Sequence, residues 1–495
     1  MTAPLRWLSV LLLLTAAAAQ VPLPPRYRDA GVVRWGADAE GGAPFVFVDA
    51  RNPQAGEIGF EVDLACELGR VLGVPFRRVQ VPYESLVQVL DRGDCDVVLN
   101  GFEATPARRA LVRLSRPYYV FQQQLSVGPK VTGVRGLGDL RGKRVGVLGQ
   151  SQSHQLLLAQ PGVDIVVYES NVTAYEDVVN GRNAGSLADV PIARALRPLF
   201  PQLVDVGEPF GEFHYCLGVR RGEPELQQAL DAALGVLLAD GSLERIYRKW
   251  QLWGPVQARL GDPAVASLYR HGADEEAAGA FDWGMAFELL GTGALRTMGI
   301  SVLSFALAVL LGMVVALVRL HGPMPLRWLA IAYVELLRGT PILVQMLLLY
   351  YGLGSIGWLQ LSATQAGILG LALNYAAYEA EIYRGALLAI PRGQREAAQA
   401  LGFTTAQMLR FVIVPQALRL SLAPSTNDFI ALFKDSSIVM VITVVELTKQ
   451  YQMLANASGR FIVLGLVTSG FYLAMSLPLA FLARRQERRL ERDHA

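Results

Sequence analysis

Three stretches of the C-terminal half of this chain contain no Asp, Glu, Lys, Arg or His: residues 297–318, 339–378 and 461–483. A helix needs about 20 mainly apolar residues to cross a bilayer, because its backbone N–H and C=O groups must be satisfied within the segment. The first and third stretches fit one helix each, and the middle one fits two, broken near "GLGSIGW" at 352–358. The sequence therefore predicts that this half is embedded in a membrane.

The apolar excess is confined to that half. With 52% hydrophobic and 18% charged residues, the 495-residue chain is more apolar than a wholly soluble protein, whereas residues 26–283 resemble an ordinary soluble sequence. The net charge is only +2, and no basic patch with interleaved aromatic residues is present, so we expect no nucleic-acid partner. A soluble region followed by a membrane domain is the predicted organisation.

Residues 1–19 have the pattern of a secretory signal peptide. Arg6 precedes an apolar run that starts at Trp7, and small residues follow up to Ala19. We expect cleavage after Ala19; an uncleaved anchor is the alternative. Either way, the soluble region would lie outside the cytoplasm.

Between residue 31 and about residue 252, short apolar runs such as "VVRWGAD" alternate with amphipathic stretches such as "GFEVDLACELGRVLG". Strands that alternate with helices favour parallel sheets covered by helices, hence the α/β class. About 225 residues exceed a comfortable single core, so two lobes are expected.

Four segments of this region resemble the polar amino-acid-binding proteins of bacterial ABC importers. They are "GFEVDLACELGRVLGV", "YESLVQVLDRGDCDVVLNGFEATPARRALVRLSRPYY", "LGDLRGKRVGVLGQS" and "GEPFGEFHYCLGVRRGEPELQQALDAALGVLLADGSLERIYRKW". The resemblance implies an α/β two-lobed periplasmic-binding-protein fold of type II over residues 26–252. Two crossing strands would act as a hinge that closes on one ligand. The first lobe would comprise residues 31–116 and the stretch after about Cys216.

The resemblance also implies a ligand site in the cleft. A buried zwitterion needs a partner for each of its charges, and a guanidinium fits a carboxylate best. Arg108 matches the arginine for the ligand carboxylate, Asp189 and Asp38 match the acids for the ammonium, and Tyr83 matches the aromatic that packs on the ligand side chain. Taken singly, Arg108 and Asp189 could be surface ion pairs and Tyr83 a core ring; their order and spacing favour ligand roles. The predicted site residues are Asp38, Tyr83, Gly101, Glu103, Arg108, Ser151 and Asp189.

Two positions depart from the family pattern. Glu103 stands where Ser or Thr is usual, and a tyrosine that commonly follows the first aspartate is missing near Gly41 or Gly42. A carboxylate in the cleft could meet a cationic or amide side chain, which favours basic or polar ligands over acidic ones. Alternatively, Glu103 pairs with a neighbouring arginine. The sequence does not name the amino acid.

Residues 253–283 are charged, contain Gly and Pro, and are predicted to form a linker. The remainder, 284–495, is predicted to be an all-α domain with five spans. Arginines at 319, 327, 384, 392, 395, 484, 485, 488 and 489 fall on one side of this arrangement, which the positive-inside rule assigns to the cytoplasm. The predicted spans are 293–318, 338–352, 363–388, 417–433 and 461–483.

The segment "EAAQALGFTTAQMLRFVIVPQ", residues 396–416, is too polar for its apolar surroundings and lies in a predicted cytoplasmic loop. It resembles the signature loop of ABC importer membrane subunits. Its neighbours "YVELLRGTPILVQMLLLYYGLG", "NYAAYEAEIYRGALLAIPRGQREAAQALG" and "VPQALRLSLAPSTNDFIALFKDSSIVMVITVVEL" resemble the histidine/glutamine-type permeases. The alternative is an interfacial amphipathic helix. The resemblance implies a coupling loop at 391–415 that fits an ATPase subunit through Glu396, Ala397, Ala398, Gly402 and Pro415.

We therefore expect a fused substrate-binding protein and permease of an amino-acid importer, a homodimer in the lipid of the bacterial inner membrane with its binding domain in the periplasm. The chain itself would be no enzyme and hold no cofactor or metal, because ATP and Mg²⁺ would bind a separate cytoplasmic ABC ATPase. An amino-acid-gated ion channel or receptor is the alternative. Against the channel, the spans follow the whole receptor instead of interrupting it, and no "TVGYG"-type filter occurs.

Ionisable residues within the predicted spans are costly in lipid and are further functional candidates, unless they pair with one another. These residues are Glu379, Glu381, Asp428 and Lys434.

Overall fold

The computed structural model describes residues 21–39, 42–48, 52, 54, 56–269, 281–353 and 361–492. The chain divides into two compact units, which we call the N-terminal unit (Met1–Phe281 with Asn456–Gly459) and the C-terminal unit (Asp282–Ala455 with Arg460–Ala495). The signal peptide predicted for residues 1–19 lies outside the described residues.

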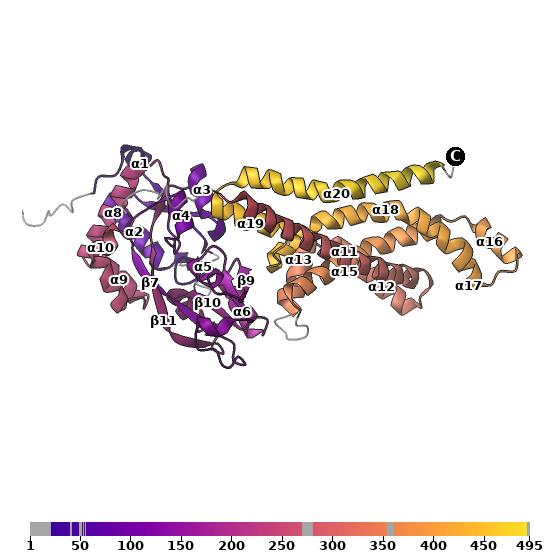
Figure 1. Ribbon diagram of the computed structural model, residues 1–495, viewed down its shortest axis with the longest axis horizontal. Coiled ribbons are helices and arrows are strands. Elements are labelled where there is room, and N and C mark those ends of the chain that lie inside the picture. Colours follow the sequence, from indigo (N-terminus) through magenta and orange to yellow (C-terminus); the bar gives the residue numbers. More distant parts are fainter. Residues whose placement is uncertain are drawn as a thin grey trace, which may run out of the picture. The chain divides into compact units, whose positions relative to one another are not determined.

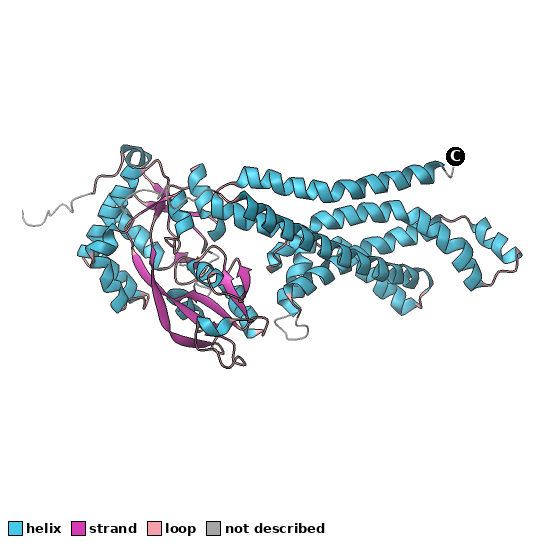
Figure 2. Ribbon diagram, in the orientation of Figure 1, coloured by secondary structure: helices cyan, strands magenta, loops and turns pink. Residues whose placement is uncertain are grey.

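The N-terminal unit contains two five-stranded sheets, each covered by helices (Figures 1 and 2). The first sheet has the order β4-β1-β5-β12-β6 and the second the order β11-β7-β10-β8-β9. The two-lobed α/β architecture predicted from the sequence is therefore confirmed. The strands of the first sheet are β1 (Val33–Ala37), β4 (Phe76–Gln80), β5 (Val97–Val98), β6 (Arg113–Leu114) and β12 (Gly218–Val219); those of the second are β7 (Tyr119–Val127), β8 (Arg144–Leu148), β9 (Asp164–Tyr168), β10 (Gly185–Asp189) and β11 (Val204–Tyr215). A short hairpin joins β2 (Phe47–Val48) and β3 (Glu57–Ile58).

Helices cover the sheets because their apolar residues recur on one face. In α2 (Phe60–Leu72), the side chains of Phe60, Leu64 and Leu68 are fully buried at four-residue spacing. The other helices of the two lobes are α1 (Pro25–Ala30), α3 (Leu86–Arg92), α4 (Pro106–Leu111), α5 (Gln152–Leu158), α6 (Asn171–Val179), α7 (Val190–Leu196), α8 (Pro224–Ala239) and α9 (Ser242–Lys249), with 3₁₀ turns η3 (Tyr83–Ser85) and η4 (Leu137–Leu140).

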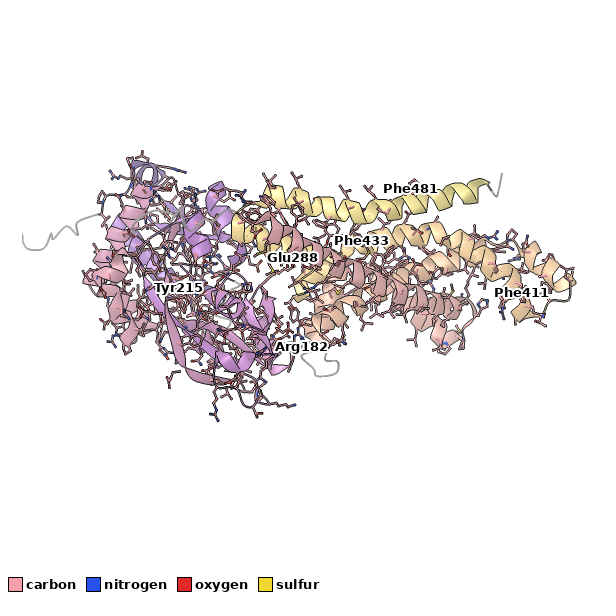
Figure 3. The ribbon with its side chains drawn as sticks, viewed as in Figure 1. Arg182, Tyr215, Glu288, Phe411, Phe433 and Phe481 are labelled. Carbon is pink, nitrogen blue, oxygen red and sulfur yellow. The ribbon has the colours of Figure 1, made fainter. Side chains whose placement is uncertain are left out.

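Two long strands run between the lobes. Strand β7 enters the second lobe after β6, and β11 returns to β12; they pair antiparallel from Tyr119 opposite Tyr215 to Val127 opposite Val204. An aromatic cluster lies at the end next to the first lobe: the ring of Tyr215 (labelled in Figure 3) stacks on Phe121 at 4.2 Å and on Tyr119 at 5.7 Å between centroids. The connection between the lobes is therefore a paired, aromatic-lined ribbon.

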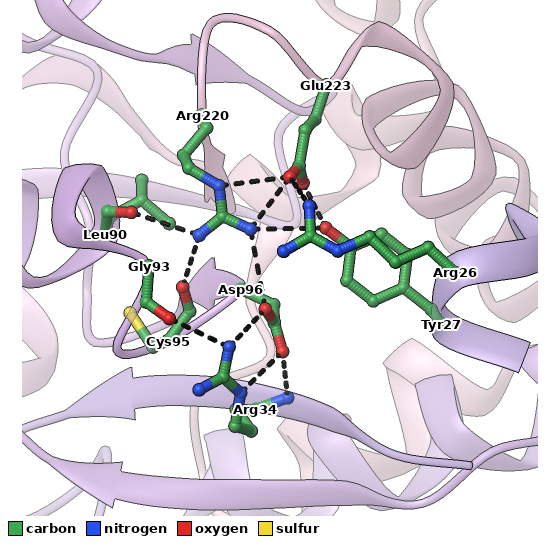
Figure 4. Close-up of polar contacts among 9 residues, drawn as sticks. All are labelled: Arg26, Tyr27, Arg34, Leu90, Gly93, Cys95, Asp96, Arg220 and Glu223. Atoms are coloured by element: carbon green, nitrogen blue, oxygen red, sulfur yellow. Dashed lines mark hydrogen bonds and ion pairs between the residues drawn. The ribbon is translucent and has the colours of Figure 1, made fainter. Parts of the chain in front are cut away.

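A polar network attaches the N-terminal helix to the first lobe (Figure 4). The guanidinium of Arg220 donates to Glu223 at 2.8 Å and to Asp96 at 3.4 Å. Tyr27, from helix α1, also donates to Glu223. The network joins helix α1, the start of β5 and the turn before α8, so it has a structural role.

The segment after α9 is folded onto this unit. The turns η5 (Pro255–Gly261) and α10 (Pro263–Ser267) follow directly, and Leu260 is only 1% exposed. The Gln257 side chain exchanges two hydrogen bonds with the backbone of Val120, at 3.1 and 2.7 Å. This part of the predicted linker is therefore ordered, because Gln257 pairs with β7 as a neighbouring strand would. Residues 270–280 lie outside the described residues.

The C-terminal unit is helical throughout its described residues (Figure 2). Its longest helix, α11 (Trp283–His321), packs along α15 (Ala363–Ala389). The other elements are α12 (Met324–Gly339), α13 (Ile342–Leu347), the π-helical turn η6 (Leu348–Gly352), α16 (Arg392–Ala400), α17 (Thr405–Met408), the π-helical turn η7 (Leu409–Ile413), α18 (Val414–Asp435), the 3₁₀ turn η8 (Ser436–Ile442), α19 (Leu447–Ser458) and α20 (Phe461–Arg492).

Two described helices are long and apolar enough to cross a bilayer: α11 and the part of α20 from Phe461 to Pro478. A third span arises if α12 and the helical stretch Ile342–Gly352, bent by 111° to each other, are counted together. The predicted continuous span 338–352 is wrong, because Thr340 is extended before Pro341 and breaks the helix there.

The remaining two predicted spans, 363–388 and 417–433, fall on the long helices α15 and α18. By composition alone neither qualifies as a span, because ionisable and amide side chains interrupt their apolar residues. The total of five spans therefore stays a prediction.

Candidate functional site

A cavity in the N-terminal unit is lined by residues of both lobes. Its empty space, open solvent at the mouth included, is about 550 Å³. Six of the seven predicted site residues line it, and the seventh, Arg108, contacts two of the six, Tyr83 and Glu103. The lining residues predicted from the sequence are Asp38, Tyr83, Gly101, Glu103, Ser151 and Asp189.

The side chain of Arg108 is buried next to the cavity, against two of its lining residues. It lies in α4, whose N-cap residue Thr105 accepts the Arg108 N–H at 3.3 Å. The buried guanidinium lies over the rings of Phe102 and Tyr83, with its carbon 4.4 and 4.9 Å from their centroids. It is 3.8 Å from the carboxylate of Glu103. A guanidinium fixed between two rings keeps a constant orientation, which suits recognition of a planar carboxylate.

Glu103 and Asp189 meet inside the cavity. They are 2% and 4% exposed, both line the cavity, and the charge of Asp189 acts on the carboxyl group of Glu103. Glu103 also accepts the backbone N–H of Gln152 at 2.7 Å, while Asp189 accepts from Gln123 at 2.8 Å and from the hydroxyl of Tyr215. Two adjacent buried carboxyl groups repel each other when both are ionised, which favours one bound proton on the pair.

The surroundings of this pair explain its protonation. Burial, and then the neighbouring charge of Asp189, raises the pKa of Glu103 well above its usual value. Burial likewise raises the pKa of Asp189 to about 6, although Tyr215 and Gln123 donate to its charged form. The expected pairing of Glu103 with an arginine is present, but as one of three contacts.

Asp38, Tyr83 and Ser151 each have a local structural partner. The carboxylate of half-buried Asp38 accepts the Tyr83 N–H at 3.1 Å and the Gln80 amide at 2.9 Å. Ser151 is the N-cap of α5, accepting the His154 N–H at 3.1 Å. These contacts fix the cavity wall, and a ligand role is additional to them.

Gly101 lies in the wall with a φ of 55°, and a Cβ there would come within 2.7 Å of the Phe45 ring. Phe45 is buried and lines the cavity, although the sequence did not indicate it. It belongs to the stretch in which the usual tyrosine is missing, so an aromatic ring still reaches this wall. The sequence feature that could have identified this ring is the phenylalanine that ends the segment "AEGGAPF", residues 39–45.

A buried carboxyl group lies directly behind Gly101. Glu61, 0% exposed, accepts the Gly101 N–H at 2.6 Å and the hydroxyl of Tyr118 at 2.5 Å, and among the described residues its Oε2 has no hydrogen-bond partner. Burial raises the pKa of Glu61 to about 7. This residue was not predicted, because its two partners are 40 and 57 positions away in sequence.

The segment 396–416 is not one helix. Helix α16 ends at Ala400, and Gly402 adopts a left-handed φ of 78°, which turns the chain into α17. Glu396, Ala397 and Gly402 are exposed, as is Pro415 at the start of α18. Ala398, by contrast, is 3% exposed and packs within the C-terminal unit. Of the five predicted coupling residues, Ala398 thus positions the helix rather than presenting a surface.

The exposed side of this segment is also apolar. Leu401 is 76% and Phe411 (labelled in Figure 3) 62% exposed. Both side chains thus leave large apolar area uncovered within the described chain.

Two of the acidic residues in the predicted spans, Glu379 and Glu381, have polar or charged partners, whereas among the described residues Oδ2 of Asp428 and Oε1 of Glu379 accept no hydrogen bond. Glu381 pairs with Arg319 and, at 2.6 Å, with Arg384, while Glu379 accepts from Ser425 at 2.8 Å. None of these contacts joins one of the four candidates to another.

Comparisons with known proteins match the two units to different families. Residues 33–252 match the bacterial extracellular solute-binding proteins, family 3, and residues 308–492 match the binding-protein-dependent transport system inner membrane component.

The two permease relatives that follow agree with the second of these matches. The glutamine transport system permease protein GlnP of Escherichia coli K12 is 38% identical over 43% of this chain and 98% of its own length. The L-cystine transport system permease protein TcyB of Bacillus subtilis is 34% identical over 41% of this chain and 87% of its own. Among solved structures, an ancestral arginine-binding protein bound to glutamine is 30% identical over 45% of this chain and 99% of that chain, at a TM-score of 0.42.

Proposed function

Because the chain belongs to the amino-acid permease family of ABC transporters and carries a family 3 solute-binding domain in the same polypeptide, we propose that it captures a polar amino acid in the cavity of its N-terminal unit and releases it to its own permease. It is an inner-membrane component of a polar amino-acid ABC transporter, a transport protein rather than an enzyme. The observation that carries the binding role is the convergence of predicted ligand residues on one cavity.

The chemistry of capture follows from the cavity wall. The guanidinium of Arg108 would take the ligand carboxylate in a two-pronged contact, and Asp189 would take the ammonium. Arg108 comes from the first lobe and Asp189 from the second, so a ligand that contacts both would hold the lobes closed about β7 and β11. The rings of Tyr83 and Phe45 would cover the ligand side chain.

We further propose that the N-terminal unit faces the periplasm and that the loop 391–415 faces the cytoplasm, as the signal pattern and the arginine distribution indicate. The exposed surface at Glu396, Ala397 and Gly402 would contact an ABC ATPase, and the permease would form a homodimer with two such subunits. ATP and Mg²⁺ would bind to the ATPase.

Fusion gives the receptor an effective concentration of roughly millimolar over its own permease, so capture does not depend on the arrival of a free binding protein. An ion channel has no support from the comparisons, since both family matches are to transporter components.

Calorimetry of the full-length protein in detergent against the twenty amino acids tests the binding role. Arg108→Ala should weaken binding by at least about 3 kcal/mol, because it leaves a desolvated carboxylate unpaired. Arg109→Ala is the matched control: its guanidinium lies over Tyr269, at 5.5 Å, whereas that of Arg108 contacts the lining residues Tyr83 and Glu103, so binding should be unchanged. Failure to bind any amino acid, or normal binding by Arg108→Ala, would contradict the assignment.

A further inference from the structure

The charged side chains that line the cavity are all carboxylates: Asp38, Glu103, Glu169 and Asp189. Glu169 is exposed at the rim, and Asp38 is half-buried with hydrogen-bond donors on both oxygens. Glu103 and Asp189 are the two that are fully withdrawn from water.

Without ligand, the pair is balanced from within. Arg108 lies 3.8 Å from Glu103, and the two neighbouring buried carboxyl groups favour one bound proton, because two full negative charges in one cavity wall repel each other. Two buried carboxyl groups, one guanidinium and one proton leave no net charge.

A bound amino acid removes this balance. Its carboxylate would engage Arg108, and its ammonium, entering at Asp189, would displace the bound proton. The site then holds three negative charges, on Glu103, Asp189 and the ligand carboxylate. It holds two positive charges, on Arg108 and the ligand ammonium. One negative charge is left unmatched. An unmatched buried charge costs several kcal/mol, so a second cation on the ligand is strongly favoured.

We propose that the cavity selects amino acids with a cationic side chain, and that Glu103 is the residue that sets this selectivity. The inference rests on the proposed function and names its substrate class.

Other side chains satisfy the cavity less well. An amide can donate hydrogen bonds to Glu103 but carries no charge, so the bound proton would have to stay. An acidic side chain adds a further negative charge to a wall already made of carboxylates. The Ser or Thr expected at position 103 would make no such demand, since a hydroxyl is neutral.

Glu103 has other contacts from which this role must be separated. It accepts the Gln152 N–H from the second lobe, and so helps to join the lobes. Glu103→Gln keeps a carbonyl oxygen for that N–H and removes only the charge. Glu103→Ser restores the usual residue and serves as a second, smaller variant.

The test measures binding of L-arginine, L-lysine, L-glutamine and L-glutamate to the full-length protein in detergent by calorimetry. We expect arginine or lysine to bind at least tenfold more tightly than glutamine or glutamate. Glu103→Gln and Glu103→Ser should lower the ratio of cationic-ligand affinity to glutamine affinity at least tenfold, and an unchanged far-UV circular dichroism spectrum shows that the variants are folded. Glu225→Gln, an equal change of charge at an exposed position of α8 away from the cavity, should change neither.

Tightest binding of glutamine by the unmodified protein, or unchanged arginine affinity in Glu103→Gln, would overturn the inference and leave the proposed function standing. Absence of binding for all four amino acids and the other sixteen would overturn both.

Discussion

Glu61 shows how the ligand wall is supported from behind. Its carboxyl group accepts hydrogen bonds from the backbone N–H of Gly101, which has a left-handed φ of 55°, and from the hydroxyl of Tyr118, one residue before strand β7. Since the charged form is penalised by burial, the folded protein keeps this group protonated up to about pH 7, whereas in the unfolded chain it ionises near 4.5.

This shift makes the stability of the N-terminal unit depend on pH. A pKa that is raised on folding contributes stability that is complete below the unfolded pKa and is lost as pH rises through the folded pKa of about 7. Between pH 5 and 8 we expect a loss of about 3 kcal/mol in the free energy of unfolding from this group. Glu61→Gln should remove that loss, as followed by the fluorescence of Trp35, Trp250 and Trp253.

The control is Glu225→Gln, which should keep the full pH dependence because its carboxylate is exposed. Equal pH dependence in Glu61→Gln and the unmodified protein would show that Glu61 is already ionised when folded.

At the scale of single residues, the sequence predicted those site residues whose side-chain type matches a part of the ligand. Arg108, Asp189 and Tyr83 could be assigned because a guanidinium, a carboxylate and a ring suit the parts of an amino acid. Phe45 and Glu61 could not, because they act through contacts with Gly101, which depend on how distant segments pack. The proximity of Glu103 and Asp189, which are 86 positions apart in sequence, could not be predicted from the sequence either.

At the scale of elements, backbone breaks decide the shape of the permease helices. Thr340 and Pro341 separate α12 from α13, and Gly402 separates α16 from α17. The break at Gly402 was predicted from its glycine. The break at Thr340 and Pro341 was not predicted, because the proline lies in an uncharged run that was assigned to one membrane span. Hydropathy locates membrane segments, whereas breaks follow from Pro and Gly.

Gly402 provides the test of the coupling loop. Its Cβ position is open, so Gly402→Asp adds left-handed strain of the order of 1 kcal/mol and a charge on an exposed turn. If an ATPase subunit docks there, this variant should bind amino acid normally yet lose substrate-stimulated ATP hydrolysis in nanodiscs. Gly241→Asp carries the same backbone strain, with a φ of 74° and open space, in the N-terminal unit, and should remain stimulated. Full stimulation in Gly402→Asp would remove the loop from the ATPase contact.

At the scale of the whole molecule, the sequence predicted both halves correctly: a two-lobed α/β binding domain and a helical permease, each matching its own family. The order of these parts was readable because the receptor pattern is complete before the first apolar stretch begins. What stays a prediction is the assembly, since dimer and ATPase contacts involve chains other than this one.

The central claim is that one polypeptide receives an amino acid and imports it at the expense of ATP. The most direct measurement is uptake of a radiolabelled amino acid into liposomes that contain the protein with its ATPase subunits and enclose ATP, with membrane current recorded in parallel. We predict accumulation that requires both ATP and the ATPase, is abolished by Arg108→Ala, and is accompanied by no ligand-gated current. Ligand-dependent current without any ATPase, or uptake that persists without ATP, would contradict it.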